Sequence, residues 1–521
     1  MNNEKLRGQL LGLYVLSAVA LAILATVFVV WNLVLPYPIH GREYIEPSLS
    51  RLLLEGKDPY GMEQNPTYLY PYGIGYHVLI YPLVKLFGPT LLLLRTVSDI
   101  AMMLAAAVLF WGMRLTRVPA LVALAGALLF YAHLACNDMC SGPNSLGVTL
   151  LLLGTVIPLA TDFRWGGILA TIVVALLAFF TKHYDILCGP VLLLYLFLYR
   201  SKTAGVVAGV IFFALLAALL WLLASIFPLF LTNVIYHSYN YTQHFTSYGH
   251  LLRVMWMYFP MGIGLVALLA WWLRGLWTAQ PSPLRTPWRW NLTDLRQPLI
   301  VQPALPWVDY LVVIYGVLYL VKMGPHAGNA LSYVFELVTP FLIWRCCILA
   351  GVEFTRSAVP VACLLATVLL VGASLVVPSV LRCRHDYRPE WSQAAAEVAK
   401  YNRVLAPGEL DGILQAQDKP VYDGGMTDLY GFCFPHNPCA IVPAYKQHCA
   451  DFYSSLQQQV RGRQFDAIIL YALPCVIDPL VPRDLVAQYY VKVGEQPLRT
   501  TLEPYRIEIW VPKPPGTIPA Q

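Results

Sequence analysis

Long runs of apolar residues recur along the first 380 positions, and short polar segments separate them. A helix of about 20 apolar residues is long enough to cross the hydrocarbon core of a bilayer. On this criterion we expect about 11 transmembrane helices. They lie near 9–31, 89–113, 118–135, 144–160, 165–181, 184–199, 204–229, 251–273, 307–322, 331–349 and 358–380. The pattern predicts an α-helical polytopic membrane protein.

One apolar segment, "YGIGYHVLIYPLVKLF" at 72–87, is shorter and is interrupted by Gly and Pro. Counting it as a span would place Arg114 and Arg117 outside the cell, against the preference of basic residues for the cytoplasmic side. We therefore expect an interfacial or re-entrant segment. The first outer loop, 32–88, is predicted to contain amphipathic helices.

The pattern changes after residue 380, where long apolar runs stop. "WSQAAAEVAKYNRVL" is predicted to be helical, "KPVYDGG" and "FDAIILYAL" to be strands leading into turns, and "PYRIEIWV" to be a final strand. The tail has about 140 residues, enough for one small domain. The predicted domains are a transmembrane domain at 1–380 and an extracytoplasmic α/β domain at 381–521.

Composition and charge agree with this organisation. The chain is 58% hydrophobic and 12% charged, whereas a soluble domain is about 25% charged. The net charge is +6, but Lys and Arg fall mostly in the short gaps between spans, which indicates the positive-inside rule rather than a nucleic-acid partner. With the N-terminus inside, the long first loop and the tail lie outside. We expect a multi-pass protein of a bacterial inner or plasma membrane.

The 11 cysteines do not indicate a metal site. Several lie in apolar runs and are expected to pack there, and no CxxC or HExxH pattern occurs. Tail cysteines could form disulfides if the tail is outside, in a pairing that the sequence leaves open. The sequence indicates no metal ligands, although it does not exclude a divalent ion.

The outer ends of the spans collect carboxylates and cations. Ionisable groups near the membrane are costly, so they are candidates for function. A carboxylate can take a proton from a hydroxyl nucleophile, and Lys, Arg and His can neutralise a phosphate leaving group. The expected phosphate-binding cluster consists of Arg95, Lys182, His183, Lys322 and His326.

Several segments carry a family resemblance in a consistent order. "GREYIEPSLSRLLLEGKDPY" and "YLYPYGIGYHVLIYPLVKLFG" resemble the acidic first loop of the GT-C membrane glycosyltransferases that use polyprenyl-phosphate sugars, a group related to protein mannosyltransferases. "RTVSDI", "SGPNSLGVTLLLLG" and "FFTKHYDILCGPVLLLYLFLYR" are similar to the spans that follow. "KMGPHAGNALSYVFELVTPFLIW" is similar to a later loop of that family.

The resemblance implies a GT-C-like helical fold, an isoprenoid-linked sugar donor and a first-loop acid as general base. Glu43 is the best match to that base, and Glu46 is the alternative. Expected sugar or acceptor contacts are Tyr44, Tyr70, Asn329, Tyr333 and Glu336. One departure is His40, which stands where many members have Asp.

Each candidate also has a structural interpretation. Glu43 could form a salt bridge to Arg42 or Arg51 instead of reacting, and Arg95 could pair with Asp99 four residues on. Lys182 and His183 could anchor the end of a span by reaching toward the membrane surface. These alternatives stay open at the level of sequence.

The leading hypothesis is an inverting glycosyltransferase that moves a sugar from a polyprenyl phosphate to an acceptor hydroxyl on the outer face. It requires no cofactor. Its partners would be the lipid-linked donor, membrane lipids, and a glycan, lipid or protein acceptor. A transporter or flippase for a lipid-linked or anionic solute is an alternative, as is a glycan polymerase or ligase that uses a lipid-pyrophosphate donor.

Overall fold

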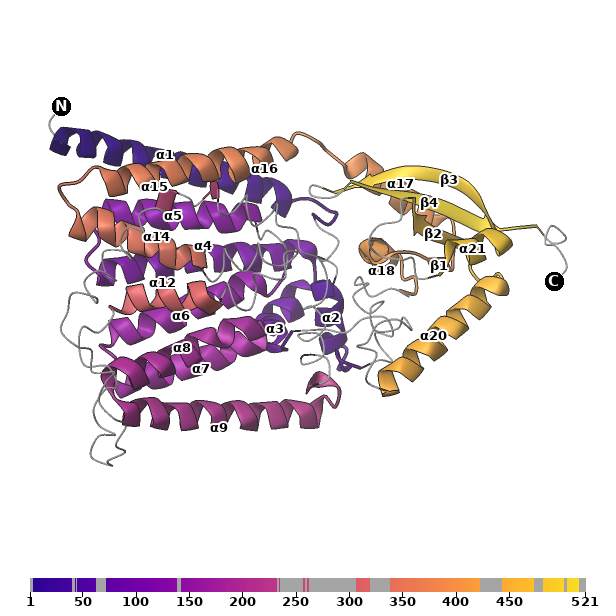
Figure 1. Cartoon of the computed structure of the whole chain (residues 1–521). Coiled ribbons are helices and arrows are strands. Elements are labelled where there is room, and N and C mark those ends of the chain that lie inside the picture. Colours follow the sequence, from indigo (N-terminus) through magenta and orange to yellow (C-terminus); the bar gives the residue numbers. More distant parts are fainter. Residues whose placement is uncertain are drawn as a thin grey trace.

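The computed structural model describes residues 3–39, 43, 45–61, 72–137, 142–231, 234, 256–257, 260–261, 306–318, 338–421, 443–472, 481–500 and 504–514. Long helices lie side by side in a bundle, and a smaller part with a β-sheet adjoins one end of it (Figure 1). The N-terminus lies at the opposite end of the bundle. We call the end that faces the sheet the domain-side end.

The bundle is built from the predicted apolar runs. Its helices are α1 (Asn3–Leu33), α4 (Leu91–Leu115), α5 (Ala120–Asn137), α6 (Asn144–Ala160), α7 (Trp165–Thr181), α8 (Cys188–Tyr195), α9 (Lys202–Ile226), α12 (Trp307–Leu318), α14 (Thr339–Ile348), α15 (Val359–Val371) and α16 (Val377–Arg382). π-helical turns extend α8 and α14 and join α15 to α16.

Five stretches of described helix are long and apolar enough to cross a membrane: Asn3–Leu33, Leu91–Leu115, Ala120–Asn137, Lys202–Ile226 and Val359–Arg382. α6, α7 and α12 are shorter apolar helices. The span expected near 251–273 lies almost entirely outside the described residues. The helical membrane architecture is confirmed, and the total of about 11 spans stays a prediction.

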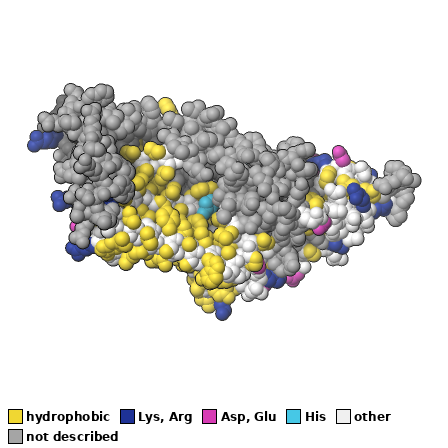
Figure 2. All heavy atoms as spheres, turned by 60° about the horizontal axis from the view of Figure 1, so that its bottom comes forward, with side chains coloured by type: hydrophobic (Ala, Val, Ile, Leu, Met, Phe, Trp, Pro, Cys, Tyr) yellow, Lys and Arg dark blue, Asp and Glu magenta, His cyan; other side chains and the backbone are white. Residues whose placement is uncertain are grey.

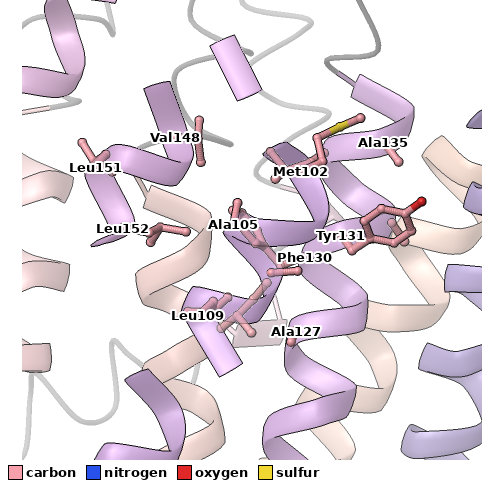
Figure 3. Packing of buried hydrophobic residues seen from close by; sticks show 14 of the residues in the cluster. Met102, Ala105, Leu109, Ala127, Phe130, Tyr131, Ala135, Val148, Leu151 and Leu152 are labelled. Atoms are coloured by element: carbon pink, nitrogen blue, oxygen red, sulfur yellow. The ribbon is translucent and has the colours of Figure 1, made fainter. Parts of the chain in front are cut away.

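Buried residues of α4, α5 and α6, both small and large, pack together (Figure 3). Ala105 and Leu109 of α4 and Ala127 and Phe130 of α5 are buried in one cluster. Alanine lets two helix backbones approach closely, which is typical of helix packing in membranes. The contact fixes α4, and α4 carries Arg95.

On the face of the bundle that Figure 2 shows, the described surface is largely apolar. On α9, Val210, Phe213 and Trp221 are exposed. Lys and Arg gather toward the ends of the molecule in this view, whereas the surface of the part that carries the sheet is mixed in type. Such an apolar belt is what a lipid bilayer would cover.

Two short helices of the first loop lie at the domain-side end of the bundle, α2 (Ile45–Leu54) and α3 (Gly75–Phe87) (Figure 1). With 13 residues, α3 is about 20 Å long. It buries Tyr76, His77, Ile80 and Val84 on one face and exposes apolar side chains on the other. This division suits a helix at a membrane interface.

The tail contains a four-stranded sheet in the order β1-β2-β4-β3. Its strands are β1 (Val404–Leu405), β2 (Ala467–Tyr471), β3 (Tyr490–Arg499) and β4 (Pro504–Pro512). β1 pairs in parallel with β2, and the other two pairings are antiparallel. The helices of this part are α17 (Arg388–Ala399), α18 (Asp411–Ala416), α20 (Pro443–Arg461) and α21 (Arg483–Tyr489).

The strands predicted in "FDAIILYAL" and "PYRIEIWV" are confirmed as β2 and β4. The helix predicted over "WSQAAAEVAKYNRVL" is too long, because α17 ends at Ala399 and Val404–Leu405 form β1. Within "KPVYDGG", residues 419–421 form no strand, and the rest lies outside the described residues.

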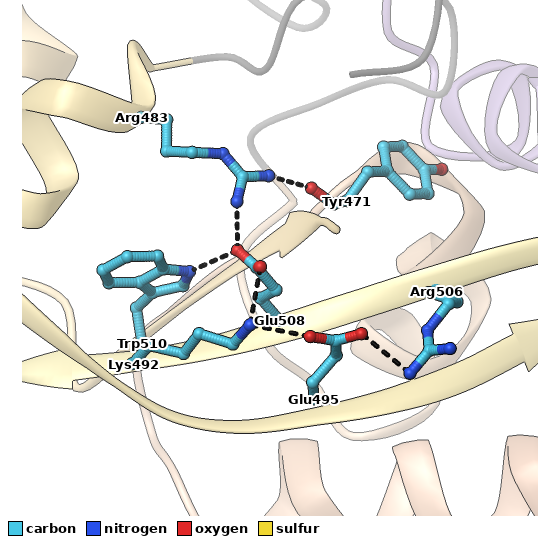
Figure 4. Close-up of polar contacts among 7 residues, drawn as sticks. All are labelled: Tyr471, Arg483, Lys492, Glu495, Arg506, Glu508 and Trp510. Carbon is cyan, nitrogen blue, oxygen red and sulfur yellow. Dashed lines mark hydrogen bonds and ion pairs between the residues drawn. The ribbon is translucent and has the colours of Figure 1, made fainter. Parts of the chain in front are cut away.

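Charged side chains link β3 and β4 across the sheet (Figure 4). Glu508 accepts from Lys492 at 2.7 Å and from the indole of Trp510 at 3.2 Å, and it also pairs with Arg483. Glu495 pairs with Lys492 and Arg506. Cross-strand pairs of opposite charge favour this register, so we assign the network a structural role.

The part with the sheet contacts the first loop directly. The Gln415 side chain donates to the Ser48 hydroxyl of α2 at 2.9 Å, and the backbone N–H of Tyr387 donates to the Tyr37 hydroxyl at 3.3 Å. The guanidinium of Arg388 lies 6.0 Å from the ring of Trp31 near the end of α1. The first loop is therefore held between the bundle and the tail.

Candidate functional site

The two acids of the first loop have different environments. Glu43 precedes α2 and is fully buried. The guanidinium of Arg95 donates to both of its carboxylate oxygens, from Nε at 3.0 Å and from the Nη2 nitrogen at 2.7 Å. The backbone N–H of Ile39 donates to Oε2 at 2.6 Å. Glu43 is thus one half of a buried bidentate ion pair.

Arg95 uses its remaining donors on backbone carbonyls in the last turn of α1 and just beyond it. Its Nη1 nitrogen donates to the carbonyls of Asn32 and Leu35, at 2.8 and 2.7 Å, and Nη2 donates to the carbonyl of Tyr37 at 2.7 Å. A guanidinium has five N–H donors, and these contacts occupy that number. Arg95 and Glu43 together fix the start of the first loop.

The ion pair between Arg95 and Glu43 tests the salt bridges that the sequence offered as structural alternatives. Arg95 forms its ion pair with Glu43, 52 positions away, rather than with Asp99. Arg51 pairs with Glu55 at 3.0 Å, not with Glu43. Arg51 for Glu43 and Asp99 for Arg95 were therefore the wrong partners, because the Glu43 carboxylate binds the guanidinium of Arg95 through two hydrogen bonds. Arg42, the other partner expected for Glu43, lies outside the described residues.

Glu46 lies one helical turn further on and contacts a different partner. Its Oε2 is 3.0 Å from Nε2 of His77 on α3, and Nδ1 of His77 is 2.9 Å from the Ser50 hydroxyl. All three side chains are buried. A carboxylate, an imidazole and a hydroxyl therefore stand in line across the α2–α3 contact.

The turn before α6 approaches Glu46. A Cβ placed on Gly142 would lie 3.8 Å from Oε1 of Glu46. The backbone N–H of Gly142 donates to the Ser98 hydroxyl of α4 at 3.3 Å, which ties this turn to the bundle. The oxygen of Glu46 that is not in contact with His77 therefore faces the beginning of α6.

Lys182 and His183 follow the end of α7 and are both buried. Burial rules out the alternative in which they reach along the lipid surface as anchors. A Cβ on Gly147, in the first turn of α6, would lie 2.0 Å from Oδ2 of Asp185 and 3.3 Å from Cβ of Lys182. Only glycine leaves room there for this polar turn.

The Tyr- and Gly-rich segment of the first loop packs against the same turn. The ring of Tyr72 stacks on His183 with centroids 6.1 Å apart. A Cβ on Gly73 or Gly75 would meet the carbonyl oxygen of Phe180 at 2.4 or 2.6 Å, so glycine is required for this close approach. The loop thereby brings an aromatic face to the cationic turn.

The phenol of Tyr60 helps to hold this segment. Burial raises the pKa of Tyr60 well above its ordinary value, with a further contribution from the nearby carboxylates of Asp58 and Glu46. The phenol therefore stays protonated and donates to the carbonyl of Tyr72 at 2.9 Å.

The described part of the candidate site thus gathers around residues 142–147, with Glu46 at one end and the turn from Lys182 to Asp185 at the other. Other predicted site residues lie outside the described residues: Tyr44, Tyr70, Lys322, His326, Asn329, Tyr333 and Glu336. Among the described residues, no three His, Cys, Asp or Glu side chains lie together as a metal site would require.

Sequence reasoning did not include His77, Ser50 or Gly147 in the site. His77 has one available signal, since it lies among Tyr76, Ile80 and Val84 on the buried face of α3. Nothing local in the sequence marks Gly147, whose importance depends on Asp185 being folded against it.

No protein-family model matches the chain, and no curated protein sequence matches it significantly. Solved structures do. The crystal structure of ArnT from Cupriavidus metallidurans bound to undecaprenyl phosphate is similar with a TM-score of 0.53 and 14% identity, over 96% of this chain and 99% of that chain. The chain shares the fold of this ArnT structure. ArnT from the same organism in the apo state gives a TM-score of 0.47 at 15% identity, over 94% of this chain and 97% of that one.

The likeness to ArnT extends over the bundle and the tail, since it covers almost the whole chain. The predicted architecture of a helical membrane bundle followed by a small part with a sheet is therefore confirmed, whereas the total of spans and the side on which the tail lies stay predictions. At 14% identity the likeness concerns the fold alone, and the site has to be argued from this chain's own residues.

Proposed function

We propose that this GT-C protein transfers a sugar from a polyprenyl-phosphate donor to an acceptor hydroxyl, on the extracytoplasmic side of a bacterial membrane. The observation that carries the proposal is that a buried carboxylate, Glu46, and a buried turn with Lys182 and His183 both lie near the start of α6. A similar fold bound to undecaprenyl phosphate supports the donor class.

Glu46 is the better candidate for the general base. The sequence favours Glu43, but both oxygens of Glu43 accept hydrogen bonds from Arg95, and Oε2 also accepts from Ile39. Three of the roughly four lone-pair sites of the Glu43 carboxylate are therefore already occupied. Oε1 of Glu46 instead faces the start of α6, and in our proposal it takes the proton of the acceptor hydroxyl.

Lys182 and His183 would hold the donor phosphate. As the acceptor oxygen bonds to the anomeric carbon, the bond from that carbon to the phosphate oxygen breaks, and the electron pair stays on the phosphate. A buried cation stabilises that charge as it develops. Tyr72, stacked on His183, offers an aromatic face to the sugar. A single displacement inverts the anomeric centre, and this chemistry requires no metal.

The test is label transfer from radiolabelled polyprenyl-phosphate sugars by the purified full-length protein. We expect Glu46→Gln to lower turnover by about 10²–10⁴-fold while donor binding survives. Glu55→Gln is the matched control, because Glu55 lies in the same loop but is exposed and pairs with Lys57 and Arg51. Full turnover by the Glu46 variant would overturn the assignment of the base.

Absence of transfer from every monophosphate donor would overturn the proposed function itself. Uptake of a lipid-linked or anionic solute into proteoliposomes would then favour a transporter, and transfer from a pyrophosphate-linked glycan would favour a polymerase or ligase.

A further inference from the structure

The proposed function leaves open which side chain, Glu46 or His77, carries the hydrogen of their contact. If Glu46 accepts a proton during transfer, it starts as a carboxylate, and Nε2 of His77 must then carry the hydrogen of their 3.0 Å contact. In a neutral imidazole the other nitrogen is an acceptor. Nδ1 then accepts from the Ser50 hydroxyl at 2.9 Å.

We infer that His77 is a positioning residue for the base, and that Ser50 holds His77 in the tautomer this task needs. The inference rests on the proposed function. Donation from Nε2 to Oε2 fixes the rotation of the Glu46 carboxylate, which directs Oε1 toward the start of α6. A nucleophile's base is commonly oriented by such a third group.

Burial makes the arrangement rigid. Ser50 and His77 are 3% and 2% exposed, and the ring of Tyr76 meets His77 edge-on with centroids 5.3 Å apart. His77 of α3 contacts two residues of α2, Glu46 and Ser50. The contact therefore also sets how α2 sits against α3.

Replacing His77 by Gln or by Asn tests its contacts with Glu46 and with Ser50 one at a time. The Gln amide nitrogen can reach the place of Nε2 and still donate to Glu46, but Gln has no group that titrates. The shorter Asn side chain reaches only to the place of Nδ1, near Ser50. We expect His77→Gln to keep kcat within about tenfold of wild type and His77→Asn to lose about 10–100-fold, the range typical of groups that orient a reacting ligand.

The experiment measures kcat, KM for the donor and thermal unfolding for wild type, His77→Gln, His77→Asn and Ser50→Ala. A loss confined to kcat in the Asn and Ala variants, with the Gln variant active, supports the inference. Equal activity of the Gln and Asn variants would overturn it. If both His77 variants unfold, Ser50→Ala decides, and an unchanged kcat there would overturn it too. An inactive wild type would instead overturn the proposed function and this inference with it.

Discussion

Tyr37 of the first loop stacks on Trp391 of α17, with ring centroids 5.6 Å apart and planes 6° from parallel. The backbone carbonyl of the same Tyr37 accepts from Arg95 at 2.7 Å. Trp391 in turn donates from its indole to the carbonyl of Arg499 at the end of β3. One tyrosine thus joins the sheet of the tail to the ion pair that fixes the start of the first loop.

Trp391→Ala should loosen the attachment of the tail. The side chain is buried, and removing a buried Trp costs about 3–5 kcal/mol. We expect faster cleavage by protease in the connection between α16 and α17 and slower sugar transfer. Trp391→Phe keeps a stacking ring and is the control. Cleavage and transfer at wild-type rates in the Ala variant would show that the stack does not hold the loop.

Arg95→Lys should be severely destabilising although it keeps the charge. An ammonium has three donors in place of five, so some of the buried acceptors around Arg95 lose their hydrogen bonds. Each buried acceptor left without a hydrogen bond costs about 1–3 kcal/mol, a loss to be measured by thermal unfolding in detergent. Arg51→Lys, at an exposed pair with Glu55, is expected to change stability by less than about 0.5 kcal/mol. Similar melting of both variants would contradict the structural role of Arg95.

Gly147→Ala should disturb the cationic turn. The added Cβ would lie 2.0 Å from Oδ2 of Asp185, so Asp185 and the neighbouring Lys182 would have to shift. We expect a lower affinity for the donor, seen as a raised KM for the polyprenyl-phosphate sugar. Gly209→Ala on α9 is the matched control, because no atom lies within 4 Å of its Cβ position. An unchanged KM in the Gly147 variant would remove Lys182 from the proposed phosphate site.

Cys383, just beyond α16, can report on which side of the membrane the tail lies. Burial raises the pKa of its thiol to about 11. Because the thiolate is the reactive form, labelling of a variant that keeps only this cysteine should rise about tenfold per pH unit below that value. A membrane-impermeant thiol reagent should label it in intact cells. Labelling only after permeabilisation would place the tail inside and overturn the extracytoplasmic site.

The spans were predictable because their signal is local. A run of apolar residues in a bilayer has to be helical to satisfy its backbone, whatever its neighbours are. Strands β2 and β4 were predictable for a related reason, since β-branched and aromatic residues fill them. The two-residue β1 was not, because it exists only through its pairing with β2, more than 60 positions away.

The sequence by itself determined that this chain is a helical membrane protein, that its first loop offers carboxylates, and that cations follow the ends of its spans. Only the tertiary structure decided which carboxylate is held by Arg95 and which faces the start of α6. The physical reason is that a buried guanidinium is most stable beside the carboxylate that leaves all its N–H donors hydrogen-bonded. For Arg95 that partner is Glu43, 52 positions away, whereas Glu46 is left to His77.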